Sequence, residues 1–350
     1  MIVRRVASAA THLITARVSI DADVPARNAD GEVLLSAIVA CDYQLPTDMI
    51  RQSALLNTAP PLQVAACPIC GPGATSLFVR SGDRDVQRCD SCRLLFSSPR
   101  PSQQDIAEFF ASQYIADRHR AEVDFSSMRE LTLRREAALI RRFLPDGGRL
   151  LDIGCASGTF MRQFANDRSW TVEGVEPSRF AAEYARSTWG LTVHTGFLRD
   201  LRLPSETFDA ITSLDSFYFH PEPNEDLAEM ARLIPPGGFL FMEIPGLAFR
   251  LAKNSGPLAY LLFGEAARLN AGLHLYFYSA RTLSRLAGKH GFHLVAKYAQ
   301  QGPVYGSCFL RLLNAAYFRL AALLYGLSGG RLNGAPKEFL VFQRPMLRPV

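Results

Sequence analysis

Apolar and polar positions change their period along the chain, and these changes mark strands and helices. Short runs rich in apolar residues at 150–153, 171–176, 208–215, 292–297 and 338–342 have the length of strands buried in a sheet. Residues 104–145 instead repeat apolar side chains at helical spacing, and Pro145-Asp-Gly-Gly ends that pattern. The apolar positions of the helical stretch are Ile106, Phe109, Phe110, Met128, Leu131, Leu139, Ile140 and Phe143. Strands that alternate with helices predict an α/β fold.

Residues 309–327 are nearly all apolar and suggest a membrane span. Arg311, Asn314 and Arg319 interrupt the stretch, and each arginine at membrane depth costs about 2.5–3.5 kcal/mol on insertion scales. We therefore expect an amphipathic or core helix between the last two strands. A weak contact of this helix with a membrane surface is the alternative that stays open.

The stretch most informative about function is Leu150-Leu-Asp-Ile-Gly-Cys-Ala-Ser-Gly158, which follows the first predicted strand. Gly154 permits a sharp exit from the strand, and Ala156 and Gly158 keep side chains away from a ligand. The helix expected next directs backbone N–H groups toward the turn. Glu176 ends the second strand, where a carboxylate can accept hydrogen bonds from both hydroxyls of a ribose. The arrangement predicts a nucleoside-binding βαβ unit.

The glycine spacing distinguishes two classes of nucleoside ligand. Enzymes that hold a dinucleotide by its pyrophosphate need G-x-G-x-x-G, whereas this chain has Gly154-x-Ala156-x-Gly158 after Asp152. A nicotinamide dehydrogenase would need the pyrophosphate turn that the pattern lacks. The pattern resembles the first motif of class I S-adenosylmethionine (SAM)-dependent methyltransferases. In that family the turn packs on the methionine part of SAM, and the acid after the second strand holds the ribose.

Further matches to this family follow in the family's order. Residues 195–204 resemble its third motif, which approaches the adenine, with Phe197 where the family often has an acid, Ser or Thr. Residues 208–215 resemble its fourth strand, 233–243 its Pro-Gly-Gly turn and fifth strand, and 274–292 the segment across its acceptor pocket. The resemblance covers about residues 104–345. It implies a Rossmann-like seven-stranded sheet of order 3-2-1-4-5-7-6 with an antiparallel last strand.

The resemblance also implies which residues bind the cofactor SAM. They are Asp152, Gly154, Cys155, Ala156, Gly158, Glu176, Pro177, Phe197, Leu198, Leu214 and Asp215. Methyl transfer to a hydroxyl or a carbon acid also needs alignment and a base. The candidates are His220, after the fourth strand, and His274, in the acceptor-covering segment, although a non-catalytic role is open for each. Relatives that methylate sugar carbons have a base histidine that aligns with Phe219 here.

Four cysteines form two C-x-x-C pairs, Cys67-Pro-Ile-Cys70 and Cys89-Asp-Ser-Cys92. Their spacing is typical of a four-thiolate zinc site, and Gly71 supplies the permissive φ that such a knuckle favours. Four protein ligands leave no open position, so we expect structural rather than catalytic zinc. Disulfides are the alternative, which a chain without a secretory pattern disfavours. Arginines expected to compensate the thiolate charge are Arg80, Arg84, Arg88, Arg93 and Arg100.

Composition and charge narrow the class of protein. The chain has 350 residues, 48% apolar and 20% charged, and can form one large α/β core with a small attached module. Its net charge of +5 is modest, and aromatic and basic residues do not interleave, so we expect no nucleic-acid partner. We predict a weakly structured extension at 1–62 with a short helix near residues 32–39, a zinc-ribbon-like module at 63–103, and a methyltransferase domain at 104–350. The first residues lack a leader or anchor pattern, which favours a cytoplasmic location.

The sequence therefore predicts a SAM-dependent methyltransferase with a structural zinc module. Its expected acceptor is a small molecule, such as a sugar, a glycan precursor or another secondary metabolite. The alternative from a different class is a binding protein that keeps the SAM fold and the zinc module without catalysis. The sequence leaves the oligomeric state open.

Overall fold

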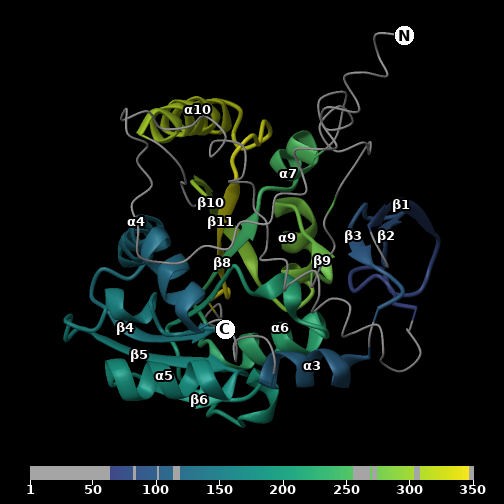
Figure 1. Ribbon diagram of the computed structural model, residues 1–350. Coiled ribbons are helices and arrows are strands. Elements are labelled where there is room, and N and C mark those ends of the chain that lie inside the picture. The colour runs from purple at the N-terminus through teal and green to yellow at the C-terminus, as the bar shows by residue number, and fades with distance from the viewer. Residues whose placement is uncertain are drawn as a thin grey trace, which may run out of the picture. The chain divides into compact units, whose positions relative to one another are not determined.

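The fold is seen in a computed structural model that describes residues 64–81, 84–100, 102–112, 119–254, 269, 274–302 and 308–346 (Figure 1). The extension predicted at residues 1–62, with its short helix, lies outside the described residues. The 102–346 part is built around a seven-stranded sheet. Its strands are β4 (Gly148–Ile153), β5 (Trp170–Glu176), β6 (Thr192–Thr195), β7 (Ala210–Leu214), β8 (Phe239–Pro245), β10 (His293–Gln300) and β11 (Lys337–Gln343).

The strand order is β10-β11-β8-β7-β4-β5-β6. Counted along the chain within this sheet, the order read from β6 is 3-2-1-4-5-7-6, which confirms the predicted topology. β11 runs antiparallel to both of its neighbours, β8 and β10, while the pairs β4–β5, β4–β7, β5–β6 and β7–β8 are parallel. The carboxyl ends of β4 to β8 therefore meet at one edge of the sheet, where ligands bind in open α/β sheets.

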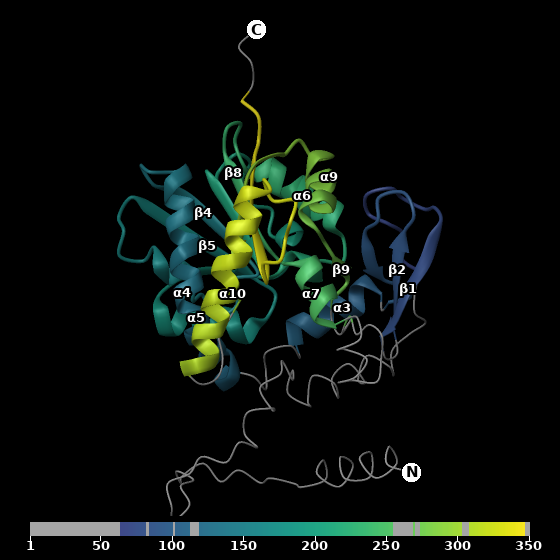
Figure 2. The same ribbon diagram turned by 90° about the horizontal axis from the view of Figure 1, so that it is seen from above.

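Alternate residues of the strands pack against helices on opposite faces of the sheet (Figure 2). Leu150 and Phe241 pack with α4 (His119–Phe143). Leu151 and Leu240 face the other layer, which contains α3 (Gln103–Ser112), α6 (Pro223–Leu233) and α9 (Ala280–Gly288). The remaining helices are α5 (Arg179–Trp189), α7 (Leu247–Asn254) and α10 (Cys308–Leu327).

The stretch predicted to be helical, residues 104–145, contains two described helices, α3 and α4, and differs from the prediction in its buried face. Ile106, Phe109 and Phe110 of α3 are buried together, as predicted. In α4 the inward face is formed by Leu133, Ala137 and Ile140, and Leu131 is 59% exposed, because it lies on the opposite side of the helix. The side chain of Met128 lies outside the described residues.

The segment after the glycine turn is not the regular α-helix that the sequence predicts. It forms turns around a short 3₁₀-helix, η3 (Met161–Gln163), with i→i+3 bonds such as Gln163 N to Phe160 O at 2.9 Å. Phe160, Met161 and Phe164 must all be buried within this short connection to β5. Phe160, Met161 and Phe164 lie at the spacing of one α-helical face, so their burial is compatible with either type of helix.

The cysteine-containing module (residues 64–100) is a small antiparallel sheet that includes a strand from much later in the chain. Its own strands are β1 (Thr75–Ser81), β2 (Arg84–Cys89) and β3 (Leu95–Ser97), and the fourth strand is β9 (Tyr276–Phe277), which pairs with β3. Leu95 lies opposite Phe277 in this pairing. The acceptor-covering segment predicted around residue 274 is therefore part of the module's sheet.

Candidate active site and cysteine cluster

The glycine turn (residues 154–158) adopts a backbone that few side chains tolerate. Gly154 and Gly158 have φ values of 73° and 79°, and Ala156 has a φ of 49°. The backbone N–H groups of Gly154 and Cys155 both donate to the carbonyl of Val175, at 2.8 and 3.2 Å. These bonds attach the turn to β5, so the end of β4 and the end of β5 form one unit.

The two glycines are required for different reasons. A Cβ on Gly154 would lie 2.8 Å from Cβ of Ser216, which follows β7. A Cβ on Gly158 would lie 2.4 Å from Cδ1 of Leu191 and 3.2 Å from Cβ of Ala185. Gly154 thus lets β7's loop approach the turn, and Gly158 lets the end of α5 pack beneath it. Gly158 was predicted to keep a side chain away from a ligand. In the structure, the atoms that a side chain at this position would meet belong to Leu191 and Ala185.

Glu176 lies at the turn as the sequence predicts, and it is hydrogen-bonded there. Its Oε2 accepts from the N–H of Ala156 and its Oε1 from the N–H of Ser178, both at 2.9 Å. The residue is only 5% exposed. Each carboxylate oxygen can accept more than one hydrogen bond, so these contacts orient the carboxylate and are compatible with a ribose.

Two residues predicted to bind the cofactor, Asp152 at the end of β4 and Cys155 in the turn, direct their side chains into the protein. Asp152 is buried and its Oδ1 accepts from the hydroxyl of Thr212 on β7 at 2.7 Å. The thiol of Cys155 lies beside Gly174 and packs with Met161 in a buried cluster. Cys155 is therefore a small packing residue, and only its backbone lines the turn.

The predicted residues that follow β6 and β7 reach the same edge. Gly196 N donates to the carbonyl of Glu176 at 3.0 Å, which brings the loop with half-buried Phe197 and buried Leu198 beside the turn. The Ser216 hydroxyl donates to the carbonyl of Ile153 at 2.9 Å, which joins the loop after β7 to the end of β4. Pro177 follows Glu176 directly, and Leu214 is the last residue of β7. The predicted cofactor residues thus meet at one edge.

Asp215 belongs to a charged cluster that the sequence analysis did not identify. It has a φ of 60° and its carboxylate forms an ion pair with Lys337 at the start of β11. Lys337 Nζ also donates to Oε1 of Glu243 on β8 at 2.7 Å. Glu243 is the one acid within the apolar run Phe239–Pro245, and that isolated charge was the available signal. All three residues lie where β7, β8 and β11 adjoin.

His220 is held by an acid of α6. Its Nδ1 lies 2.8 Å from Oδ2 of Asp226, which is buried at the start of that helix. The ring of Phe217, in the 3₁₀-helix η5 (Phe217–Phe219), lies 5.1 Å from the His220 ring between centroids. Asp226 also approaches Nε of Arg199 at 4.0 Å. The histidine is therefore fixed against the first turn of α6.

His274 lies on the other side of η5 and has a cationic partner. Its Nδ1 is 2.9 Å from Nη1 of Arg250, and its ring stacks on Tyr218 with centroids 4.4 Å apart. Burial lowers the pKa of His274 well below its usual value, and the charge of Arg250 lowers it further, against a smaller opposite effect of Asp215. His274 is therefore neutral at pH 7. Sequence reasoning missed Arg250 and Tyr218.

Comparisons with known proteins agree with this geometry. Residues 125–297 match a family model described as a methyltransferase domain. This stretch of the chain therefore resembles a methyltransferase domain. A sugar N,N-dimethyltransferase of Streptomyces venezuelae, which acts on dTDP-3-amino-3,4,6-trideoxy-alpha-D-glucopyranose, is 32% identical over 112 residues, or 31% of this chain and 46% of that relative. A fatty-acid O-methyltransferase of Mycolicibacterium smegmatis is 30% identical over 98 residues, or 27% of this chain and 36% of that relative.

The chain spans less than half the length of these two relatives. Among solved structures, a SAM-dependent methyltransferase of Thermotoga maritima, described as a possible histamine N-methyltransferase, is similar with a TM-score of 0.43. That pair is 21% identical and covers 69% of this chain and 100% of the other.

Next to the methyltransferase domain, the four predicted cysteines form a cluster. One Sγ atom from each of Cys67, Cys70, Cys89 and Cys92 lies within 4.8 Å of the other three. The Sγ atoms of Cys67 and Cys92 are 3.5 Å apart, and none of the four cysteines forms a disulfide. A tetrahedral zinc site with Zn–S bonds of about 2.3 Å has sulfur atoms about 3.8 Å apart, so the donor set fits zinc.

The two cysteine pairs adopt the same backbone shape. Gly71 N donates to the carbonyl of Cys67 at 2.8 Å, and Arg93 N donates to that of Cys89 at 2.9 Å. Gly71 and Arg93 have φ values of 76° and 68°, so Arg93 adopts the left-handed conformation that glycine has in the first knuckle. Burial raises the pKa of Cys92 to about 11. Burial also acts to raise the pKa of Cys89, but N–H groups of Cys92 and Ser91 outweigh it and lower the value to about 7.

Residues of the methyltransferase domain hold the first knuckle. Asn224 Nδ2 on α6 donates to the carbonyl of Pro68 at 2.9 Å, and Lys289 Nζ, after α9, donates to that of Ile69 at 3.1 Å. His290 Nε2 lies 3.0 Å from Oδ1 of Asn224 and fixes the amide. Lys289 is thus a cation at the cluster, and neither it nor Asn224 was predicted.

Three of the five arginines expected to compensate the thiolates have other described partners. Arg80 lies 3.9 Å from Asp85, and Arg88 donates to the hydroxyl of Ser76. Arg100 donates to the carbonyl of Pro221 at 3.1 Å, next to His220. These contacts stabilise the module's strands and join the module to the loop that carries His220. The side chain of Arg84 lies outside the described residues.

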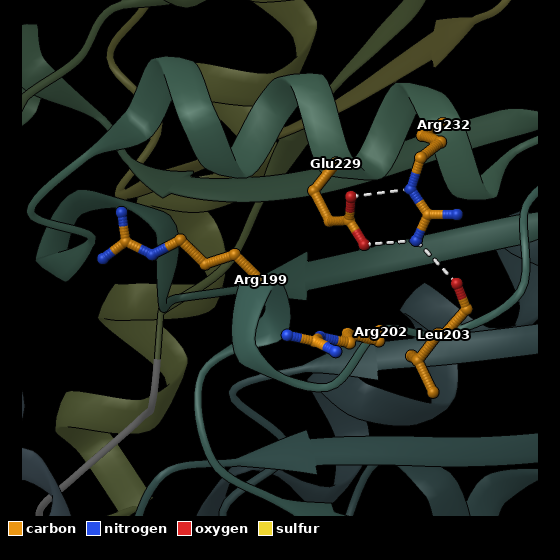
Figure 3. A pocket seen from close by; sticks show the side chains of 5 residues that line it. All are labelled: Arg199, Arg202, Leu203, Glu229 and Arg232. Carbon is orange, nitrogen blue, oxygen red and sulfur yellow. Dashed lines mark hydrogen bonds and ion pairs between the residues drawn. The ribbon is translucent and has the colours of Figure 1, made fainter.

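A polar surface pocket of about 260 Å³ lies between η4 (Leu198–Asp200) and α6 (Figure 3). Its lining residues are Arg199, Arg202, Leu203, Glu229 and Arg232. Figure 3 shows Glu229 paired with Arg232, whose Nη2 also donates to the carbonyl of Leu203. These contacts attach the loop after β6 to α6 and so stabilise the surroundings of Leu198.

Proposed function

We propose that the chain transfers a methyl group from SAM to a small-molecule acceptor and that the cysteine cluster holds a structural zinc ion. The observation that carries the proposal is the glycine turn, closed by the bond from Ala156 N to Glu176 Oε2 at 2.9 Å, in a sheet of the methyltransferase order. Relatives named as sugar N,N-dimethyltransferases support a nucleotide-linked sugar as the acceptor class.

The residues of the glycine turn fit SAM. The buried carboxylate of Glu176 is oriented to accept ribose hydroxyls, and Ala156 and Ser157 present only small side chains beside it. We assign SAM binding to the predicted set from Asp152 to Asp215, with Asp152 and Cys155 contributing through the position they give the turn. When bound, SAM supplies an electrophilic methyl group, and the protein supplies position and proton transfer.

The partners of the two histidines favour different roles. An ionised carboxylate only accepts, so Nδ1 of His220 donates to Asp226 and its Nε2 carries the lone pair. A guanidinium only donates, so Nδ1 of His274 accepts from Arg250 and its Nε2 carries the proton. We therefore propose His220 as the general base and His274 as a hydrogen-bond donor that orients the acceptor. Asp226 is then a positioning residue for His220.

We assign zinc a folding role, because the cluster offers four protein thiolates. Free cysteines at this spacing also favour a reducing, cytoplasmic compartment. Loss of the metal would then remove no catalytic group. It would release the first knuckle, which Asn224 and Lys289 contact.

Calorimetry of the full chain with SAM and with NAD tests the cofactor, and a mass-shift screen across nucleotide sugars tests the acceptor. We expect SAM to bind, NAD not to bind, and at least one sugar to gain a methyl group. Binding of NAD alone would contradict the proposal. Binding of SAM without methylation of any sugar, lipid or other small acceptor would favour the non-catalytic binding protein.

A further inference from the structure

The helix α10 exposes a continuous apolar face. Its sequence has apolar residues on two sides, and Ala321 and Tyr325 of the inward side pack beside β10 and β11. Tyr325 donates to Glu338 Oε1 at 3.1 Å, and Lys297 lies over its ring. The leucines of the outward side are Leu312 (65% exposed), Leu320 (57%), Leu323 (57%), Leu324 (42%) and Leu327 (78%). Figures 1 and 2 show α10 at the periphery of the described chain.

Leu312 lies eight residues before Leu320, and the others follow at intervals of three, one and three residues. At 3.6 residues per turn all five face one side of the helix and form a stripe along it. Leu332, five residues after the helix, is also exposed, at 61%. Isolated exposed leucines are common on protein surfaces, but a contiguous patch of this kind marks an interaction site. No described helix is both long enough and apolar enough to cross a membrane, so the stripe is not the side of a spanning segment.

The charges beside the stripe determine which partner fits. The sequence from residue 301 to residue 336 contains Arg311, Arg319 and Arg331 and no aspartate or glutamate. Arg319 is exposed at the edge of the stripe and Arg331 is exposed beside Leu332. A second copy docked through the same face would bring these arginines toward one another, because a two-fold interface pairs a surface with itself. A negatively charged lipid surface complements both the leucines and the arginines.

We propose that the outward face of α10 binds the surface of an anionic lipid bilayer. The helix lies in the plane of the interface, its leucines enter the headgroup region, and the arginine stems extend to the lipid phosphates. The inference rests on α10 and its following loop, and it is independent of the proposed methyl transfer. It places the enzyme where acceptors that are themselves lipids, or are attached to lipids, are presented.

Co-sedimentation of the full chain with vesicles tests the inference. The probes are vesicles of pure phosphatidylcholine and of an equimolar mixture of phosphatidylcholine and phosphatidylglycerol. We expect binding to the mixed vesicles that weakens with salt, and much weaker binding to the neutral ones. The double variant Leu323→Glu/Leu327→Glu should abolish binding. Leu77→Glu, which changes an exposed leucine of β1, should bind as the wild type does.

The double variant Arg319→Gln/Arg331→Gln should weaken binding by about fivefold for each arginine. Circular dichroism and light scattering of every variant establish that it is folded and report its oligomeric state. Failure of the folded wild type to bind the mixed vesicles would overturn the proposal. A second contrary result would be a wild-type protein that does not bind lipid and forms a dimer, with Leu323→Glu/Leu327→Glu dissociating that dimer. The face would then join two copies of the chain. Binding unchanged in the arginine variant would also contradict it.

Discussion

The glycine-turn region (residues 150–178) and the histidine region (residues 216–226 and 274–278) lie at the same edge of the sheet and are built differently. In the first, hydrogen bonds such as Ala156 N to Glu176 Oε2 and Gly154 N to Val175 O join residues close in sequence. In the second, local contacts such as that of His220 with Asp226 are joined by contacts from distant segments. Ser97 donates to the carbonyl of His274 at 2.7 Å, and Arg100 donates to the carbonyl of Pro221.

The second region therefore depends on the cysteine-containing module. Strand β9, directly after His274, pairs with β3 of the module, and Leu275 N donates to the carbonyl of Tyr218 at 3.1 Å. We infer that the glycine-turn region keeps its shape without the module, whereas the histidine region loses contacts from several directions. Each prediction below tests one side of this difference.

The largest effect is expected from the metal. Structural zinc contributes about 10–16 kcal/mol of binding free energy in small zinc domains, and much of it requires all four ligands. We predict one zinc ion per chain, and a large loss of folding stability in Cys89→Ser, measured by metal analysis and urea unfolding. Cys155→Ala, which removes a thiol outside the cluster, should keep its zinc. A reduced wild-type preparation, never exposed to chelator, that holds well under one equivalent of zinc would refute the assignment.

The next effect concerns the proposed base. Removal of a general base typically lowers turnover by about a hundred- to ten-thousand-fold. We predict such a loss in His220→Ala with SAM affinity nearly unchanged. Asp226→Asn should lower turnover less and shift its pH dependence, because it changes the partner of Nδ1 and leaves Nε2 in place.

Two other histidines serve as comparisons for His220. His274→Ala should mainly raise the Michaelis constant of the acceptor, because the residue is proposed to donate a hydrogen bond. His293→Ala, at an exposed position, should leave turnover unchanged. Equal turnover of wild type and His220→Ala from about pH 6 to pH 9 would remove His220 from the mechanism.

A smaller effect is expected for the carboxylate at the end of β5. Glu176→Ala should weaken SAM binding by about 1.5–3 kcal/mol, the value of a charge-assisted hydrogen bond, as measured by calorimetry. Zinc content should not change, since the residue has no contact with the module. Glu173→Gln, three residues earlier on the same strand, should bind SAM normally. Unaltered SAM affinity in a folded Glu176→Ala protein would show that the proposed cofactor site is wrong.

The smallest effect is a pH dependence of stability within β5. Burial acts to raise the pKa of Glu173, but hydrogen bonds from His194 and Arg149 outweigh it and lower the pKa below its ordinary value of 4.5. A carboxylate whose pKa is lower in the folded state than in the unfolded state stabilises the folded protein fully at pH values above the unfolded-state pKa. This stabilisation is lost as the pH falls through the folded-state pKa. Glu173→Gln should therefore cost about 0.5–1 kcal/mol at neutral pH. Urea unfolding should show the difference from wild type shrinking below about pH 4; a constant difference would disagree.

Local patterns made the glycine-turn region predictable from the sequence. Gly154, Gly158 and Glu176 belong to one unit of two adjacent parallel strands, β4 and β5, and their short connection, and the two C-x-x-C pairs likewise fix their own geometry. The sheet order was predicted from the family resemblance. The contacts of Lys337 with Asp215 and Glu243, and of Asn224 with Pro68, join residues far apart in sequence and have no periodic signal. The 3₁₀ geometry of η3 was missed because Phe160, Met161 and Phe164 have the spacing of one α-helical face, so the apolar pattern does not distinguish the two helix types.

The most direct test of the difference between the two regions is SAM titration and amide hydrogen exchange on the same protein with and without its metal. We predict that metal-stripped protein binds SAM within about threefold of the loaded protein, since the described hydrogen bonds of the glycine turn run to β5 and to the loop after β7, and not to the cysteine-containing module. Exchange should accelerate at residues 216–226 and 274–278, where the module supplies the contacts, and stay slow at 150–153. Loss of SAM binding together with the metal, or unchanged exchange in the histidine region, would contradict the account.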